Sequence, residues 1–120
     1  MSAHSKSNRE HSFDIELASI VGLEKAILLK NVSYWCEENE RRQNSDFFQY
    51  NTWWTEESLN SLVAKYPYLK RASISRWMNE LHDSKWMRMM SILGGKNLYA
   101  PGPVFVIWNA GGDWRTYINR

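Results

Sequence analysis

Basic side chains cluster in the second half of the chain, where residues 70–88 hold five of them against two acids. A guanidinium group such as that of Arg76 can make bidentate hydrogen bonds to guanine or to a phosphate, and the amide of Asn79 can pair with adenine. These side-chain types are suited to contacting nucleic acid. If the partner is DNA, we expect the contacts from ten residues: Lys70, Arg71, Ser73, Ser75, Arg76, Asn79, Lys85, Arg88, Lys96 and Asn97.

The net charge of +2 conceals a separation of the two signs along the chain. Residues 13–60 hold nine acids and four bases, which gives −5, whereas residues 61–120 hold nine bases and three acids, which gives +6. A basic half on a nearly neutral chain favours an anionic partner, and nucleic acid is the commonest one. A chain with one acidic and one basic solvent-exposed face would give the same charge counts without any anionic partner. The sequence motifs must therefore decide between these two interpretations.

No set of residues has the spacing of a catalytic or metal site. The histidines His4, His11 and His82 lie far apart, and Cys36 is the single cysteine. Neighbouring acids on helices point in different directions, and the glycine pair at 94–95 has no helix after it to bind a phosphate. We therefore expect no catalytic residue, no metal and no cofactor, and a protein that is not an enzyme.

Length and composition predict one domain with a core. The 120 residues are 43% hydrophobic, and no apolar stretch approaches the roughly 18 residues that span a bilayer. A single cysteine excludes an internal disulfide, so we expect a cytoplasmic protein without a membrane partner. Residues 1–12 are predicted to be a disordered polar leader, 13–109 the domain, and 110–120 a tail that leads into a further region if the chain is part of a longer protein.

The first half of the domain is expected to contain two helices and a short strand. Apolar residues at helical spacing predict a helix over 13–21, which Gly22 would end in the left-handed conformation. A second helix, over residues 23–40, is apolar around most of its circumference and should therefore be central. Aromatic and β-branched residues within 47–54 predict a short strand.

The second half is expected to begin with two helices joined by a tight turn. Thr55 would cap a helix over 56–66, and Pro67 would stop it. A further helix over 70–84 places its apolar residues on one face, with Arg71, Ser75, Arg76 and Asn79 on the other.

A β-hairpin should follow the last helix. The glycine pair at 94–95 lies between apolar runs and is typical of a hairpin tip, and Val104 to Trp108 favours a further strand. This order of elements predicts a mainly α fold with a small β-sheet (α+β), a winged helix-turn-helix. Its recognition helix would be residues 70–84, lying in the major groove, and its wing about residues 87–108.

Because the chain has seven tryptophans among 120 residues, we expect the core to be built on these large side chains. We expect core positions for Trp35, Trp77 and Trp86. Because adjacent residues of a strand face opposite ways, one of the pair at 53–54 should point outward. Trp108 and Trp114 should cover one another or mark an interface.

The chain resembles the N-terminal winged-helix domains of phage, prophage and plasmid replication proteins over roughly residues 13–90. The match is carried by Phe13-Asp14-Ile15, Gly22-Leu23, Ala26-Ile27-Leu28-Leu29, Asn31, Tyr34-Trp35, the aromatic strand, Tyr66-Pro67-Tyr68, Ile74, Arg76 and Leu81. In this family the domain binds origin DNA, often ahead of a region that recruits a helicase or its loader. Two positions depart from the family: Lys70 stands where a capping serine is usual, and Lys85 where a glycine usually ends the recognition helix.

The resemblance implies a domain that binds specific double-stranded DNA in a phage or plasmid replication initiation protein. Both departures add a positive charge near the expected DNA face. Two alternatives stay open. One is a winged-helix transcription regulator, usually a dimer, and the other is a protein-interaction module that recruits a helicase or loader through exposed aromatic side chains.

Overall fold

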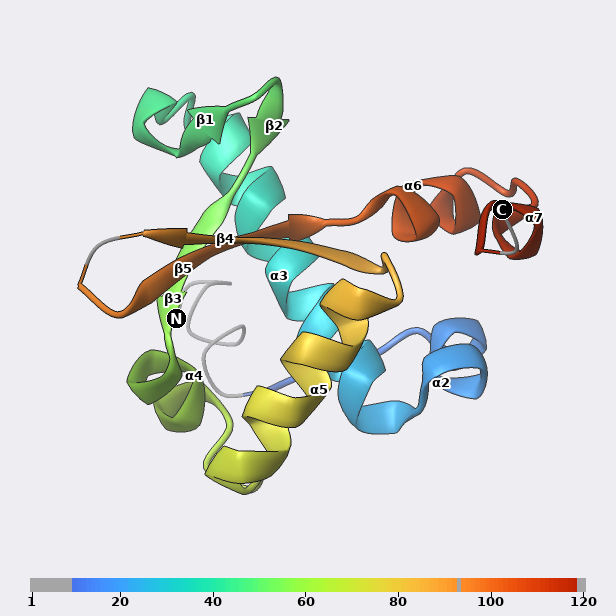
Figure 1. Cartoon of the computed structure of the whole chain (residues 1–120), viewed down its shortest axis with the longest axis horizontal. Coiled ribbons are helices and arrows are strands. Elements are labelled where there is room, and N and C mark those ends of the chain that lie inside the picture. Colours follow the sequence, from blue (N-terminus) through green and yellow to red (C-terminus); the bar gives the residue numbers. More distant parts are fainter. Residues whose placement is uncertain (1–9, 93, 119–120) are drawn as a thin grey trace.

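Six α-helices and two small antiparallel sheets make up the part of the chain that the structure, a computed structural model, describes: residues 10–92 and 94–118 (Figure 1). The domain is therefore of the α+β class, and its order of elements is compatible with a winged helix. The elements are α2 Ile15–Val21, α3 Leu23–Arg41, the 3-10 helix η1 Ser45–Phe47, β1 Phe48–Gln49, β2 Thr52–Trp53, β3 Thr55–Ser58, α4 Leu59–Lys65, α5 Arg71–Asp83, β4 Met87–Ile92, β5 Lys96–Pro101, α6 Pro103–Asn109 and α7 Trp114–Ile118.

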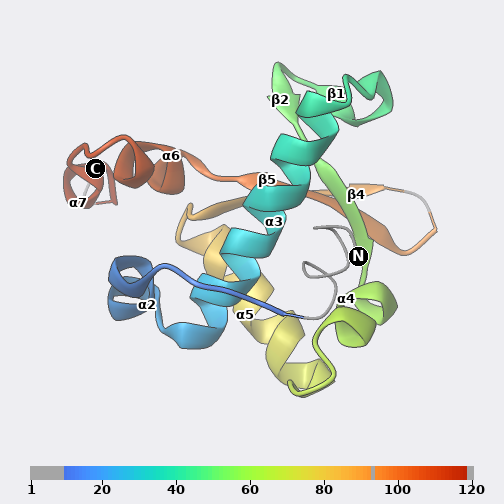
Figure 2. The ribbon, with the colours of Figure 1, turned by 180° about the vertical axis from the view of Figure 1, so that it is seen from behind.

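Helix α3 is the centre of the fold, as its nearly continuous apolar sequence predicts. It contacts α2, α5 and the strands β2, β3 and β5, and it buries Ala26, Leu28 and Leu29 completely. Figures 1 and 2 show α3 crossing the three-stranded sheet on the side opposite to the viewer of Figure 1. At its start Gly22 has the expected positive φ of 98°, but its ψ of 155° is extended rather than left-handed helical.

The aromatic segment 47–54 forms two short strands instead of one. β1 and β2 pair as a hairpin with Phe48 opposite Trp53, and the turn residues Tyr50 and Asn51 both have positive φ. This hairpin lies at the end of α3, away from α4 and α5 (Figure 1).

The predicted helix start at Thr55 is wrong. Residues Thr55–Ser58 form β3, which pairs with β5 so that Thr55 lies opposite Tyr99, and the helix starts only at Leu59. The capping box that starts α4 is made by Ser58 and Ser61, whose side chains each accept from the other's backbone N–H. The acids before it therefore belong to a strand and not to a first helical turn.

The three-stranded sheet has the order β3-β5-β4, and β4 and β5 form the expected hairpin. Met89 lies opposite Tyr99, and the loop between Ile92 and Lys96 contains Gly94 and Gly95, both with positive φ. Leu98, Tyr99 and Ala100 of the central strand are buried in one core with residues of α3 and α5.

The strand predicted over Val104–Trp108 is a helix, so the hairpin ends at Pro101 and the expected wing boundary of residue 108 is wrong. Helix α6 starts with Pro103 in its first turn, where a missing N–H costs nothing, and buries Val104 and Phe105. Before it, the Gly102 N–H donates to the Trp86 carbonyl at 2.9 Å. A Cβ at Gly102 would lie 2.3 Å from the Lys85 carbonyl oxygen, so only glycine fits this contact.

The tryptophans divide between the core and its margins. Trp86 and Trp54 are buried, with 4% and 5% of their surface exposed, whereas Trp35 and Trp77 are only half-buried. Trp53 is half-buried and packs on Phe48. The two late tryptophans cover Trp86 rather than one another: Trp108 lies 6.4 Å and Trp114 5.1 Å from its ring.

The expectation of a disordered leader falls mostly on residues 1–9, which lie outside the described part of the chain. Within that part, His11 packs against the turn between α4 and α5, because its ring lies 4.6 Å from that of Tyr66 and its Nδ1 lies 2.6 Å from the hydroxyl of Tyr68. No helix in the described residues is both long and apolar enough to cross a membrane.

Candidate nucleic-acid interface

Helix α5 has one apolar and one polar face, because its apolar residues recur every three or four positions. Ile74, Met78 and Leu81 are buried in the core, as the sequence predicts. On the polar face Arg76 and Asn79 are exposed. Ser73 and Ser75 are half-buried, so they offer short hydroxyl groups at the edges of this face. Such a face can contact base edges and phosphates.

The start of α5 is occupied by two exposed cations. Lys70 is the N-cap residue, and its side chain makes no capping hydrogen bond. A serine there would accept a hydrogen bond from a backbone N–H of the first turn, so lysine gives up about 1 kcal/mol of helix stability. Together with Arg71, it places two positive side chains at this end of the helix.

Lys85 follows the end of α5 in a left-handed conformation. Its φ is 68°, in the region where glycine is the least strained residue. The backbone is fixed on both sides: the Lys85 N–H donates to the His82 carbonyl at 3.1 Å, and the Lys85 carbonyl accepts from the Val104 N–H at 3.1 Å. The ammonium group of Lys85 lies 5.5 Å from the ring of Tyr117.

Glu80, one of the two acids of α5, is largely neutralised by its neighbours. Glu80 accepts from Lys25 of α3 at 2.8 Å and lies 3.9 Å from Arg76. The hydrogen bond from Lys25 is the main reason why the pKa of Glu80 is lowered, with the charges of Lys25 and Arg76 adding to it. Arg76 keeps an exposed guanidinium group, and its Cζ lies 5.6 Å from the ring of Trp77.

Several cations near α5 have no carboxylate partner within residues 10–92 and 94–118. Some acids pair with cations outside this helix: Glu57 binds Lys65, and Glu38 binds Arg41 and Arg42. The cations that form no ion pair in this part of the chain are Lys30, Lys70, Arg71, Lys85, Arg88 and Arg115. Four of these six are predicted contact residues, so positive charge remains uncompensated where the sequence predicts contact.

At the tip of the β4–β5 hairpin, both predicted contact residues have a partner within the sheet. The ammonium group of Lys96 lies 3.5 Å from the carboxylate of Glu56 on β3. The Asn97 amide donates to the hydroxyl of Tyr99 at 3.1 Å, and its residue is half-buried. The ion pair with Glu56 partly neutralises Lys96, and the hydrogen bond to Tyr99 holds the Asn97 side chain against the sheet.

Arg88 does not lie with the residues at the start of α5. It belongs to β4, and its Nη1 donates to the Thr52 hydroxyl of β2 at 2.7 Å. It lines a groove of about 530 Å³ together with Lys85 and His82. The ten predicted residues therefore divide between the polar face and start of α5, the hairpin tip, and this groove beyond the end of α5.

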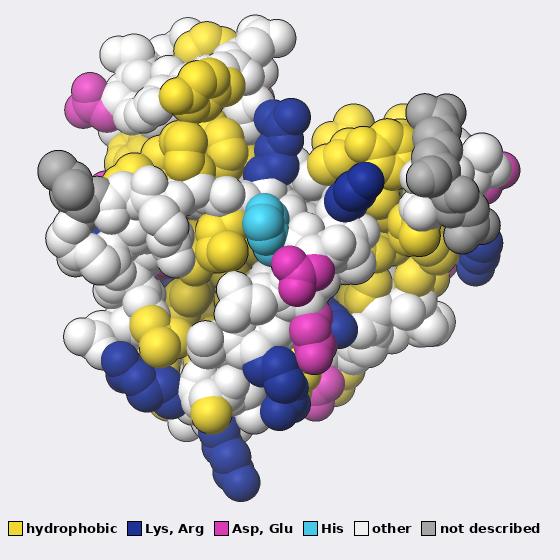
Figure 3. Space-filling view, viewed as in Figure 1, with side chains coloured by type: hydrophobic (Ala, Val, Ile, Leu, Met, Phe, Trp, Pro, Cys, Tyr) yellow, Lys and Arg dark blue, Asp and Glu magenta, His cyan; other side chains and the backbone are white. Residues whose placement is uncertain are grey.

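Figure 3 shows how these parts share one side of the molecule. Lys and Arg side chains gather near both ends of α5, with acidic side chains between them on one flank. Hydrophobic side chains fill the space between the β4–β5 hairpin and the helix. The groove beyond α5 was not predictable from the sequence, because the β1–β2 turn, β4 and the end of α5 meet there only in the folded chain.

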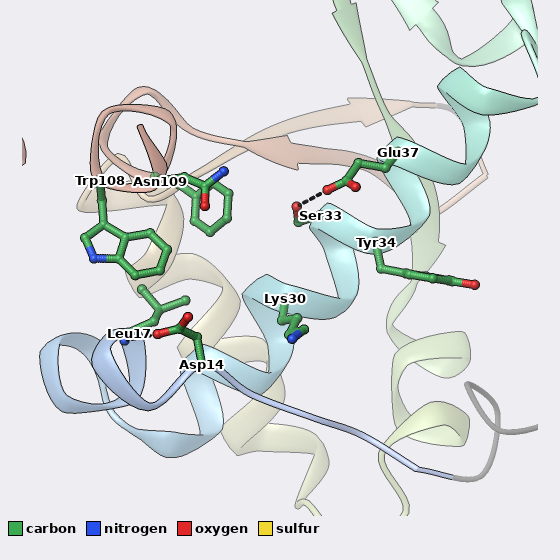
Figure 4. A pocket seen from close by; sticks show the side chains of 9 residues that line it. Asp14, Leu17, Lys30, Ser33, Tyr34, Glu37, Trp108 and Asn109 are labelled. Atoms are coloured by element: carbon green, nitrogen blue, oxygen red, sulfur yellow. Dashed lines mark hydrogen bonds between the residues drawn. The ribbon is translucent and has the colours of Figure 1, made fainter. Parts of the chain in front are cut away.

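A separate pocket of about 250 Å³ lies between α2, α3 and α6. Figure 4 shows Asp14 and Trp108 on one side of it and Lys30, Ser33 and Glu37 along α3. The Asp14 carboxylate caps α2 by accepting from Leu17 N–H at 3.0 Å, and Glu37 accepts from the Ser33 hydroxyl at 3.3 Å. Its charged groups are of both signs and are partly engaged, so the pocket does not favour an anionic ligand.

The fold favours the neutral forms of His11 and Cys36. Burial, and secondly the charge of Lys65, lowers the pKa of His11. Burial also raises the pKa of the Cys36 thiol to about 12, and its Sγ donates to the Tyr99 carbonyl at 3.3 Å. Among the described residues, no group of three His, Cys, Asp or Glu side chains is placed to hold a metal ion.

Comparison with protein-family models, with curated proteins and with solved structures found no match to this chain.

Proposed function

We propose that this chain is a winged helix-turn-helix module that binds specific double-stranded DNA and carries out no catalysis. In this proposal α4 and α5 form the helix-turn-helix and β4–β5 is the wing. The order of elements supports this assignment, because a helix pair followed directly by a hairpin is typical of that fold.

One observation supports DNA binding above the others. The exposed face of α5 presents Arg76 and Asn79, and the cations at its start, Lys70 and Arg71, have no acidic partner in the described part of the chain. Ion pairs within a protein reduce the gain from binding phosphate, so unpaired cations on one helix favour an anionic partner.

The mechanism follows from this arrangement. Positive charge would bring the module to the phosphate backbone, and α5 would then enter the major groove with its polar face towards the bases. Arg71 and Asn79 offer contacts to guanine, phosphate or adenine. Lys96 of the hairpin would contact the neighbouring backbone and position the module on the duplex.

The biological setting that we propose is replication initiation in a phage or plasmid, with a helicase or its loader as a further partner. Its support is the sequence resemblance over residues 13–90 and the two positions, Lys70 and Lys85, at which the departures from that family add positive charge. Both positions lie at the ends of α5.

Fluorescence anisotropy with a labelled duplex tests DNA binding. The duplex should be taken from the DNA around the coding region, where a footprint would also locate the binding site. Arg76→Ala should weaken binding, whereas Arg42→Ala, which removes the same charge from the end of α3, should leave it unchanged. Absence of binding at low salt would refute the proposal.

A protein-interaction module is the second candidate, and one groove favours it. This groove of about 710 Å³ lies between α3, β2 and α6, where Trp53 and Val106 provide apolar surface, Glu37 and Glu40 provide negative charge and Arg88 provides one positive charge. On this alternative, charge reversal at Arg71 would leave function intact while replacement of Trp53 would abolish it. A transcription regulator would in turn be expected to dimerise, and a strictly monomeric state in solution would count against it.

A further inference from the structure

The groove beyond the end of α5 combines aromatic, cationic and thioether side chains. It lies between the β1–β2 turn, β4 and the last turn of α5, with Pro103 of α6 and Tyr117 of α7 also in its lining, and its volume is about 530 Å³. The lining includes Tyr50, Trp54, His82, Lys85, Arg88 and Met90. Because His82 belongs to α5, the groove adjoins the helix that we propose to lie on duplex DNA.

The charge of this groove is positive. Lys85 and Arg88 have no carboxylate partner among residues 10–92 and 94–118, and the acceptor of Arg88 there is the neutral hydroxyl of Thr52. A guanidinium group has five N–H donors, so this bond leaves Arg88 with capacity to bind a phosphate. Asp83 lies 3.7 Å from His82 but does not line the groove.

Tyr50 presents its ring at the margin of the groove in an unusual backbone conformation. It is 77% exposed, and it has φ of 52° next to Asn51 with φ of 56°. Two-residue hairpin turns with positive φ favour asparagine and glycine, so a tyrosine in this conformation is held against its backbone preference. Strain of this kind tends to persist at functional positions.

The hairpin that carries Tyr50 is fixed to the core. The Trp54 indole N–H donates to the Gln49 carbonyl at 3.0 Å, and the Trp54 backbone N–H donates to the Phe47 carbonyl at 2.8 Å. The Asn39 amide of α3 donates to the Trp54 carbonyl at 2.8 Å. An exposed aromatic ring on such a braced turn needs little ordering when it binds a flat ligand.

We infer that this groove binds an unpaired DNA strand, with a base stacked on Tyr50 and the backbone held by Lys85 and Arg88. Stacking on a side chain needs a base with a free face, which a base inside a duplex does not offer. An aromatic platform beside a cationic track is the combination by which proteins bind single strands. The inference rests on the proposed function, since the duplex held by α5 would supply the strand.

The test uses the whole chain with a fluorescein-labelled oligo-dT and, separately, a labelled duplex, both in low salt. Tyr50→Asn removes the ring with a residue that tolerates positive φ, and it should weaken oligo-dT binding about 5- to 150-fold. Tyr50→Phe keeps the ring and should keep the affinity. Tyr34→Ala, which removes an exposed tyrosine from α3, is the matched control and should have no effect.

Arg88→Ala should make the slope of log K against log salt for oligo-dT binding less steep by about 0.7, because each phosphate contact on a single strand contributes about that much to the slope. Duplex binding should be unchanged by Tyr50→Asn. If the chain binds the duplex but not oligo-dT, or if Tyr50→Asn binds oligo-dT as the parent does, the strand site is refuted while the proposed function stands. If neither DNA binds, both are refuted.

Discussion

Glycine at position 85 should give a more stable fold than alanine at the same position. Lys85 has φ of 68°, in the left-handed region, where every residue with a Cβ meets the following carbonyl oxygen. Lys85→Ala and Lys85→Gly both remove the ammonium group and its contact with Tyr117. The two variants therefore differ in the Cβ alone, which isolates the backbone conformation from the charge.

The size of the difference follows from two opposing contributions. Relief of the left-handed conformation is worth about 1–2 kcal/mol. Against it, glycine adds freedom to the unfolded chain, which costs about 0.4–1 kcal/mol. Taking the middle of each range, the free energy of unfolding of Lys85→Gly should exceed that of Lys85→Ala by about 0.8 kcal/mol, which corresponds to a Tm difference of about 2–6 °C.

Urea denaturation followed by tryptophan fluorescence measures this difference, and oligo-dT binding by the same two variants measures the effect of the charge. We expect equal losses of DNA affinity in both variants, because both lack the ammonium group. A Lys85→Ala variant as stable as Lys85→Gly would show that the position is not left-handed in solution. The reasoning about the end of α5 would then be wrong.

Three further outcomes are expected. Gly102→Ala should prevent correct folding, as judged by circular dichroism, because the added Cβ would lie only 2.3 Å from the backbone carbonyl oxygen of Lys85. The fold lowers the pKa of His11 from its usual 6.5, so the folded state binds a proton less readily than the unfolded state does. The free energy of unfolding should therefore fall as the pH drops below about 6.5. Urea midpoints measured across this pH range should fall less in His11→Gln than in the parent chain. Cys36 should resist alkylation by iodoacetamide at mildly alkaline pH until urea unfolds the chain, since burial raises its thiol pKa to about 12; rapid alkylation of the native chain would contradict this.

Local periodicity was sufficient to predict the helices that pack through one face. Helix α5 occupies Arg71–Asp83, against an expected 70–84, because Ile74, Met78 and Leu81 recur at helical spacing and no other element competes for them. Central α3 was predictable for the same reason, since its sequence is apolar around most of its circumference.

Segments whose conformation depends on a distant partner were predicted wrongly. Thr55 and the acids after it resemble a helix start, but pairing with β5 makes them a strand. Val104 to Trp108 is rich in β-branched and aromatic residues, yet Pro103 in the first turn and the tight contact at Gly102 start a helix there. In both places the tertiary contact overrides the local preference.

The candidate site divides in the same way. The exposed positions of Arg76 and Asn79 follow from the spacing of a single helix. The hydrogen bond from Arg88 to Thr52 joins residues 36 apart in the chain, and the groove beside it is lined by residues from position 50 to position 117, so no local pattern indicates them.

The salt dependence of duplex binding tests the central claim most directly. If Lys70, Arg71, Arg76 and Lys96 each neutralise one phosphate, log K should fall with log salt with a slope of about −3.6, which weakens binding about 150-fold between 50 and 200 mM salt. Arg71→Ala should reduce the slope to about −2.7. A duplex affinity that does not change with salt, or a slope that Arg71→Ala leaves unchanged, would contradict the assignment of α5 as the DNA-binding helix.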